Sequence, residues 1–497
     1  MKSKKLCAVG LAAMLALMSL TACGTGTAAG NAGSASSEAA TETAETAGEI
    51  LTEADITVNE TLEDTSDGGH VIEADGQEVS YSNIKVVKSG EASGDEADFY
   101  GENAAIFATN GAAVTLSDMV VTTDGTHANG VFSYGEGTVV NISHSVIETT
   151  GNCSGGLMTT GGGTMNASDL TIHTTGNSSA AIRSDRGGGT VTVTGGNYTT
   201  DGTGSPVIYS TADITVSDAV LTSTASQGVV VEGKNSVTLR NVQLTADNNT
   251  KNSDKSEYYQ AVMIYQSMSG DAAEGASSFT MEGGTLTNRN GDILFVNNTV
   301  TEITLHDVEI INEDADGVFL RAAAAGWGNE GSNGGQVTMN AEKQEINGDM
   351  VVDDISVLNL SLADGSVLNG AINAENSEGQ IYVELTGGSK WVLTADSYIT
   401  SLTCDTDSID LNGHTLYVGG EAYQAGTAST GEAIEITVTS SGGGMPEGMP
   451  GGQDGAPPEK PDGELGPGSQ NGTPPEKPDG EGGPGAEGGT PSAKPGD

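Results

Sequence analysis

One short motif recurs eight times along the chain: Val114-Thr115-Leu116, Val140-Asn141-Ile142, Met165-Asn166-Ala167, Val191-Thr192-Val193, Ile214-Thr215-Val216, Val237-Thr238-Leu239, Phe279-Thr280-Met281 and Ile303-Thr304-Leu305. Each copy consists of an apolar, a polar and a second apolar residue. Successive copies start 23 to 26 residues apart, with one interval of 42. So regular a spacing indicates stacked structural repeats, because it places equivalent residues of successive repeats in one row.

A second apolar position accompanies every copy of the motif. It is the seventh residue after the start of the copy, and it is occupied by Val121, Ile147, Ile172, Tyr198, Leu221, Leu244, Leu286 and Ile310. Another short strand is predicted elsewhere in each repeat, as at 105–107, 130–132, 156–158, 180–182, 206–208 and 228–230. Turns rich in Gly, Asn, Asp and Ser separate these strands, and helical periodicity is absent.

A repeat of this size can bury its apolar side only against the repeats before and after it, so equivalent strands should stack in parallel. The polar middle residues of the motif should then form one outward ladder. Phe132 is expected to point inward, in a row with Phe107, Met158, Ile182 and Ile208.

This pattern resembles the right-handed parallel β-helix of the pectin-lyase-like superfamily, and the resemblance covers roughly residues 55 to 440. It implies an all-β solenoid. The regular coils are expected at 51–350, and irregular terminal coils with a cap at 351–441, where strand-like runs such as 381–385 and 434–438 persist without close alignment.

The N-terminal segment has the pattern of an export signal. Lys2, Lys4 and Lys5 precede an apolar run at 6–18, and Leu20-Thr21-Ala22-Cys23 follows. These four residues resemble the lipobox of bacterial lipoproteins. The resemblance implies that residues 1–22 are removed and that Cys23 carries a diacylglycerol anchor on the outer side of a membrane. An ordinary signal peptide with a coincidental cysteine is the alternative.

Both flanks of the repeat region are low in large apolar residues. Residues 23–50 should form a flexible tether. Residues 442–497 hold 12 of the 13 prolines and contain Pro-Pro-Glu-Lys-Pro-Asp-Gly-Glu twice, at 457–464 and 474–481, which is typical of a disordered acidic tail.

The formal net charge of the chain is −50. Nucleic acids and anionic membrane surfaces need clustered Lys and Arg, so both are excluded as partners, and the membrane is contacted through the lipid alone. Cationic partners and divalent ions are favoured.

The cysteines offer no disulfide framework and no cysteine-based metal cluster. Apart from Cys7 in the signal and Cys23, only Cys153 and Cys404 remain, and they lie far apart in the sequence. Buried, inert thiols are expected at both positions.

Enzymes of the resembled superfamily attack polysaccharides with clusters of Asp, or with an Arg or Lys base beside acids that hold calcium. The tightest match in this chain is Arg183, Asp185 and Arg186, which directly follow a predicted strand. An ion pair within a turn accounts for these residues equally well. Glycoside hydrolysis needs two carboxylates at a defined separation, and no one pair stands out.

Three insertions interrupt the repeats, at about 246–260, 267–278 and 322–336. The second and third follow the same type of strand two coils apart, so they should project from one corner. We predict that their aromatic residues form a platform on which sugar rings stack: Trp327, Tyr258, Tyr259 and Tyr265. The alternative is that these rings fold back over the coil.

Calcium is a possible cofactor, because acid-rich turns supply the oxygen ligands that it prefers. The candidates are Asp314 and Asp316, and the similar turn at 405–407, although such turns also form without an ion. The outward threonine ladder resembles ice-binding surfaces, but threonine is also an ordinary exposed strand residue.

Two classes of function remain. The first is a non-catalytic cell-surface binding protein, either an adhesin or a polysaccharide-binding protein. The second is a surface polysaccharide lyase or glycoside hydrolase. They differ in whether acids and bases from neighbouring coils converge.

Overall fold

The computed structural model describes residues 50–253 and 255–437. The export signal, Cys23, nearly all of the tether and the acidic tail lie outside the described residues. The described chain is mainly β-strand, with one 3-10 helix, η1 (Glu53–Asp55), and one α-helix, α1 (Asp95–Phe99). None of its helices is both long and apolar enough to span a membrane.

A first ladder of parallel strands contains all eight copies of the motif. In pairing order its strands are β3 (Glu78–Ser82), β6 (Ala113–Ser117), β9 (Val139–Thr149), β11 (Gly163–Thr174), β13 (Gly189–Thr194), β16 (Asp213–Ser217), β19 (Ser236–Ala246), β21 (Ala276–Asn288), β23 (Thr299–His306), β26 (Gly335–Glu342), β29 (Val357–Ala363), β31 (Gln380–Leu385) and β34 (Ser401–Thr403). The register pairs the middle residues of the motif with one another from Thr115 to Thr304, and none of them is buried. The outward ladder is therefore confirmed.

A second parallel ladder contains the apolar residues that lie seven positions further on. Its strands are β1 (Glu60–Asp64), β4 (Ile84–Lys88), β7 (Val120–Thr123), β9, β11, β14 (Asn197–Thr200), β17 (Val220–Ser223), β19, β21 and β24 (Glu309–Asn312). The two ladders meet at a corner where most coils place one left-handed residue, as at Asp118 (φ 53°) and Asn241 (φ 52°). Asp and Asn tolerate this conformation better than most residues do.

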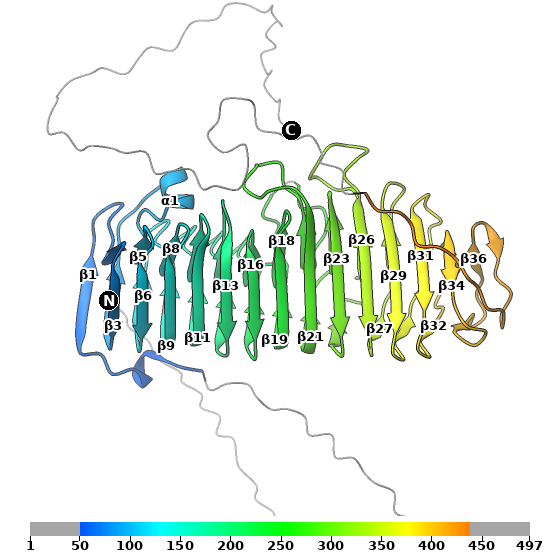
Figure 1. Ribbon diagram of the computed structural model, residues 1–497, viewed down its shortest axis with the longest axis horizontal. Coiled ribbons are helices and arrows are strands. Elements are labelled where there is room, and N and C mark those ends of the chain that lie inside the picture. The colour runs from blue at the N-terminus through cyan, green and yellow to red at the C-terminus, as the bar shows by residue number, and fades with distance from the viewer. Residues whose placement is uncertain (1–49, 254, 438–497) are drawn as a thin grey trace, which may run out of the picture. The chain divides into compact units, whose positions relative to one another are not determined.

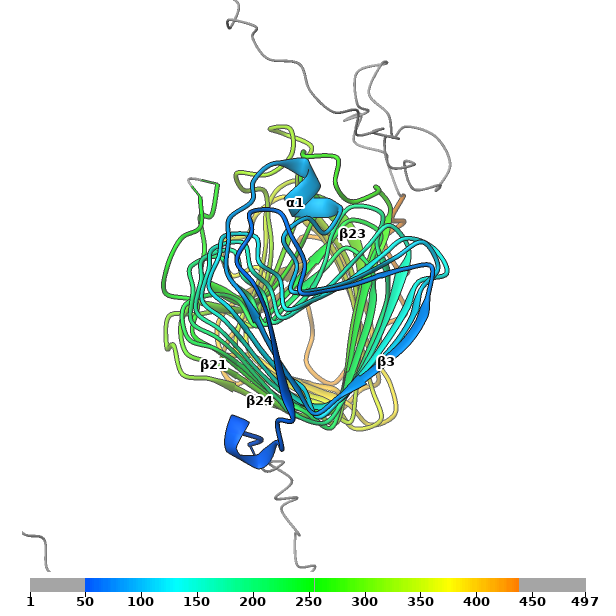
Figure 2. The same cartoon turned by 90° about the vertical axis from the view of Figure 1, so that its left-hand side faces the viewer.

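A third ladder forms a separate parallel sheet of short strands. Its members are β2 (Ile72–Asp75), β5 (Ile106–Thr109), β8 (Val131–Tyr134), β10 (Leu157–Thr160), β12 (Ile182–Ser184), β15 (Ile208–Ser210), β18 (Val229–Glu232), β20 (Gln260–Tyr265), β22 (Asp292–Asn297), β25 (Leu320–Ala322) and β28 (Met350–Val352). We call it the covered sheet, because α1 and the loops of the insertions lie over its outer face (Figure 2).

The covered sheet corrects the expected orientation of Phe132. Its register aligns Phe132 with Met158 and then with Arg183, whereas Ile182 pairs with Leu157 in the neighbouring row. Phe132 therefore points away from the coil interior. It is nonetheless fully buried, in an outer cluster with Phe107, Met158 and the half-buried Tyr100 next to α1. The row was misaligned because the consecutive residues Val131 and Phe132 are both apolar and both buried, so alternation does not show which of them faces the coil interior.

The coils continue beyond residue 350. The position of the second ladder is continued in a separate parallel sheet by β27 (Glu345–Asn347), β30 (Val367–Asn369), β32 (Lys390–Val392) and β35 (Ile409–Asp410). The last sheet contains β33 (Ser397–Ile399), β36 (Leu416–Val418) and β37 (Glu421–Ala422). The strand expected at 434–438 is absent from the described part of that range. There Ile434 instead exchanges two backbone-to-amide hydrogen bonds of 2.9 Å with Asn359 of β29.

Inside the described region, the ladders enclose one apolar core, which extends from Ile72 to Leu416. Figure 1 shows the strands stacked in sequence order, and Figure 2, seen along the stack, shows successive coils lying over one another. All named strand pairs are parallel except β36 with β37. The structure is thus an all-β, parallel-strand fold consistent with a β-helix.

Candidate functional site

The first candidate, Arg183 with Asp185, is a closed ion pair. Arg183 lies on the outer face of the covered sheet, where its Nη2 donates to Asp185 Oδ2 at 2.7 Å and its side chain is only 16% exposed. Its guanidinium also lies 5.9 Å from the ring centre of Tyr209 in the next coil. A base that is held in an ion pair of this kind is poorly placed to accept a proton from a substrate.

Arg186 is equally engaged. Its Nη2 donates to Asp271 at 2.8 Å and its Nη1 to Asp95 at 3.3 Å, while its guanidinium stacks 3.8 Å from the ring centre of Phe99. Arg186 therefore joins α1 to the insertion at 267–278. The contacts of both arginines are explained by a structural role, because they hold the segments that cover the outer face of the sheet.

Two coils further along the same sheet lies a carboxyl group that sequence reasoning missed. Glu232 is 1% exposed, and its Oε2 accepts hydrogen bonds from Tyr209 and, at 2.9 Å, from Tyr265. Burial raises the pKa of Glu232 and also of the two tyrosines. No pattern in the sequence pointed to it, because Glu232 has no acidic neighbour and the tyrosines lie in other coils.

The aromatic insertion residues fold back onto the covered sheet. Tyr265 and Trp327 meet edge to face with ring centres 5.1 Å apart, and Tyr258 lies 5.3 Å from Phe295. These four rings share one apolar cluster, in which Tyr258 and Trp327 stay half-buried. The insertions at 267–278 and 322–336 do lie two coils apart, after β20 and β25, as expected.

Cations cover the faces of three of these insertion rings. Lys255 Nζ lies 4.5 Å from the ring centre of Trp327, Arg321 covers Tyr258 at 4.3 Å, and Lys251 lies 5.5 Å from Tyr259. Tyr259 belongs to neither the apolar cluster nor a ring pair among the described residues. A sugar could stack on Trp327 or Tyr258 only after displacing a side chain.

The acid-rich turns use their carboxylates locally. Asp314 accepts backbone hydrogen bonds from Gly291 at 2.8 Å and Asp316 at 3.0 Å, and these bonds lower its pKa. Asp316 is exposed, and Asp407 pairs with Lys390 at 2.7 Å. Neither turn gathers three or more close His, Cys, Asp or Glu side chains in the part of the chain that the structure describes.

A hollow of about 260 Å³ lies over the outward ladder of β6, β9, β11 and β13. It is lined by side chains such as Thr115, Asn141, Asn166 and Thr192, and the Asn166 amide donates to Asn141 at 3.0 Å. Its lining contains hydroxyls and amides but no aromatic ring.

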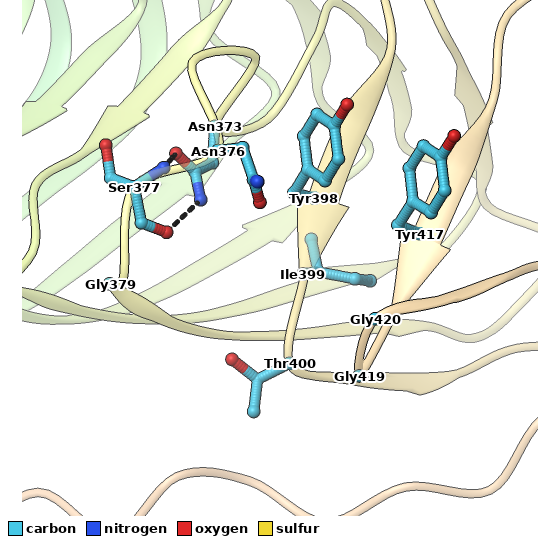
Figure 3. Close-up of a pocket in the computed structure, with 10 residues that line it drawn as sticks. All are labelled: Asn373, Asn376, Ser377, Gly379, Tyr398, Ile399, Thr400, Tyr417, Gly419 and Gly420. Atoms are coloured by element: carbon cyan, nitrogen blue, oxygen red, sulfur yellow. Dashed lines mark hydrogen bonds between the residues drawn. The ribbon is translucent and has the colours of Figure 1, made fainter.

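A second pocket, of about 200 Å³, lies near the C-terminal end of the coils. Tyr398 of β33 and Tyr417 of β36 stack with ring centres 4.8 Å apart and planes 2° from parallel. Figure 3 shows the Tyr398 ring facing the loop that carries Asn373, Asn376 and Ser377. The pocket thus combines a flat aromatic face with side-chain amides.

The loop beside Tyr398 is held rigidly. Asn373 is buried, and its amide both accepts from the backbone N of Ser377 at 3.0 Å and donates to the Ser377 carbonyl at 3.1 Å. Asn376 is exposed and projects between this loop and Tyr398 (Figure 3). Sequence reasoning overlooked the pocket because Tyr398 and Tyr417 come from coils with little motif similarity. Their aligned spacing of 19 residues was the available signal.

The cysteines differ in their surroundings. Cys404 is buried, as expected, but Cys153 is half-buried beside His127 and Asp98. The Nε2 of His127 lies 2.8 Å from Asp98 Oδ1, and this contact raises the pKa of His127 to about 10 while it lowers that of Asp98. An inert thiol was predicted because the cysteines were compared only with one another, and His127, one coil away, was not considered.

Comparison with known proteins gives no match to this chain among protein-family models, curated proteins or solved structures.

Proposed function

We propose that this protein is a non-catalytic, polysaccharide-binding surface protein, anchored through Cys23, and that its coils form a right-handed β-helix of the pectin-lyase-like type. The observation that carries the binding proposal is the pocket beside Tyr398. A sugar presents C–H groups on its ring faces and hydroxyls at its rim. The Tyr398 ring suits the former, and the exposed amide of Asn376 suits the latter.

The size of the pocket favours one sugar unit of a longer chain. Pockets that enclose drug-sized ligands usually measure about 300–1,000 Å³, whereas this one has about 200 Å³. A polysaccharide would place one ring against Tyr398 and leave its other units on the surface. A catalytic role is less well supported, because Arg183 and Arg186 are both held in ion pairs.

The binding proposal is tested with a glycan array probed by the full chain in detergent. On the glycans that bind, Tyr398→Ala should lower affinity about tenfold, which corresponds to about 1.4 kcal/mol. Tyr398→Phe keeps the ring and should bind as the unaltered chain does. Trp327→Ala is the matched control, because it removes a half-buried ring from the aromatic insertion.

The possible outcomes separate the two aromatic sites. If Trp327→Ala weakens binding and Tyr398→Ala does not, the sugar site lies at the insertion and the pocket assignment is wrong. If the full chain binds no glycan on the array, polysaccharide binding itself is refuted.

The anchor is tested separately at Cys23. Cys23→Ala should release the protein from the membrane fraction or leave its signal uncleaved, since the thiol that accepts the lipid is gone. Incorporation of labelled palmitate measures this directly. Equal labelling of the variant and the unaltered chain would exclude Cys23 as the lipidation site.

A further inference from the structure

A group of three chemically reactive side chains lies where α1 meets two successive coils. Asp98 belongs to α1, His127 precedes β8, and Cys153 precedes β10. One carboxylate oxygen, one imidazole nitrogen and the thiol sulfur lie within 4.8 Å of one another. Among residues 50–253 and 255–437, no other group of three His, Cys, Asp or Glu side chains lies this close together.

The turn does not by itself explain Cys153. Both His127 and Cys153 stand at the same corner of successive coils and have left-handed backbones, with φ of 58° and 56°. The next two coils place Ser178 and Gly204 at this corner. Left-handed geometry is easiest for Gly and Asn and is also found for His, so the cysteine is the residue that the turn leaves unexplained.

The imidazole of His127 is oriented as in a metal ligand. Its Nδ1 lies 3.0 Å from the carbonyl oxygen of Ala92, which can only accept, so Nδ1 carries a proton. Nε2 is thereby directed toward Asp98 Oδ1 at 2.8 Å and toward the thiol. Histidines that bind metals commonly donate their other ring N–H to a backbone carbonyl in this way.

We propose that Asp98, His127 and Cys153 form a Zn²⁺ site with three protein ligands, namely a carboxylate oxygen, Nε2 and Sγ. Zinc accepts this mixture of oxygen, nitrogen and sulfur, whereas calcium takes oxygen ligands alone. Ligand atoms around tetrahedral zinc lie about 3.3–3.7 Å apart. Zinc would displace the proton between His127 Nε2 and Asp98 Oδ1, so that their 2.8 Å contact widens by about 0.6 Å, and the thiol sulfur, now within 4.8 Å, would complete three ligands. The fourth position is left for water or an exogenous ligand.

Zinc at this position would attach α1 to the coils. α1 is attached to the covered sheet by Arg186 and by the bond from Thr160 to the Phe99 carbonyl. The nearby Arg183 is paired with Asp185, and its charge, like that of Arg186, still lowers the pKa of Asp98. This proposal is independent of the sugar pocket, which lies in the C-terminal coils.

The test uses the full chain titrated with Zn²⁺ by calorimetry and, in parallel, with Co²⁺ by absorption spectroscopy. One ion per chain is expected, and Co²⁺ should give the intense near-ultraviolet band of a cobalt–thiolate bond. Cys153→Ser should abolish that band, and Ser178 at the equivalent corner indicates that serine is accommodated. Cys404→Ser, which removes a buried thiol elsewhere, should leave the band unchanged.

The histidine is tested against a matched His–Asp pair. His173 Nε2 lies 2.7 Å from Asp201 Oδ2 on the surface. Among the described residues, no cysteine joins this pair in a group that could hold a metal ion. His127→Asn should lower Zn²⁺ affinity at least about 100-fold, because even outer-shell losses cost 10–100-fold. His173→Asn should have no effect. Absence of Zn²⁺ binding, a cobalt–thiolate band that survives Cys153→Ser, or equal effects of the two histidine variants would overturn the proposal.

Discussion

Replacing Gly176 with alanine is expected to destabilise the coils by more than about 4 kcal/mol, beyond the range of most single substitutions. A Cβ at residue 176 would lie 1.8 Å from the carbonyl oxygen of Gly151 in the preceding coil and 2.9 Å from Ser179 Oγ. Backbone atoms cannot yield as a flexible side chain can. The collision therefore has to be relieved by separating two hydrogen-bonded coils.

The same corner repeats this close approach in neighbouring coils. A Cβ at Gly151 would lie 1.9 Å from the Gly125 carbonyl oxygen, and one at Gly202 would lie 1.9 Å from that of Gly176. Beside them, Ser154, Ser179 and Ser205 form a buried ladder in which the backbone N–H of each of the first two donates to the Oγ of the next serine. Displacement of one coil would therefore disturb its neighbours.

Urea denaturation followed by circular dichroism measures the effect of Gly176→Ala. Gly111→Ala is the control, because its added Cβ meets nothing within 4 Å although its φ is 76°. The control should lose only the roughly 1–2 kcal/mol of an alanine in a left-handed backbone. Equal midpoints for Gly176→Ala and the unaltered chain would contradict the stacking of coils at this corner.

The two ladders that carry the motif were predictable from sequence, whereas the covered sheet was only partly so. In the former, a short turn of fixed length separates the motif from the apolar residue seven positions on, so Thr115 and Val121 keep constant offsets from their counterparts. In the covered sheet, consecutive residues such as Val131 and Phe132 are both apolar, so Phe132 was placed one row out of register.

Periodicity also could not reveal that an outer face is buried. Alternation distinguishes the two faces of a strand, but it does not show whether the outer face is exposed to solvent. Phe132 points outward and is buried because α1 and the insertions cover that face. The candidate zinc ligands could be predicted only in part from the sequence, for the same reason. His127 and Cys153 are 26 residues apart, one coil, whereas Asp98 belongs to an insertion whose path no repeat predicts.

The two tryptophans illustrate how differently the coils and the insertions use an indole. Trp327 was singled out from sequence as a contact residue, yet it is half-buried against Tyr265 beneath Lys255. Trp391 of β32 was predicted only as part of a strand-like run, because apolar residues in strands are expected to be core. It is fully buried in the main apolar core, and its Nε1 donates to the carbonyl of Gly370 at 2.9 Å.

Trp391→Ala is therefore expected to cost about 4–5 kcal/mol, the upper part of the range for large aromatic truncations, since it also leaves the Gly370 carbonyl without its indole donor. Trp327→Ala should cost about 1–2 kcal/mol, because its ring is only half-buried and so loses less apolar contact on truncation. Urea denaturation followed by far-ultraviolet circular dichroism compares both without relying on tryptophan emission. A larger loss for Trp327→Ala than for Trp391→Ala would mean that the insertion, and not the stacked coils, carries the stability of this region.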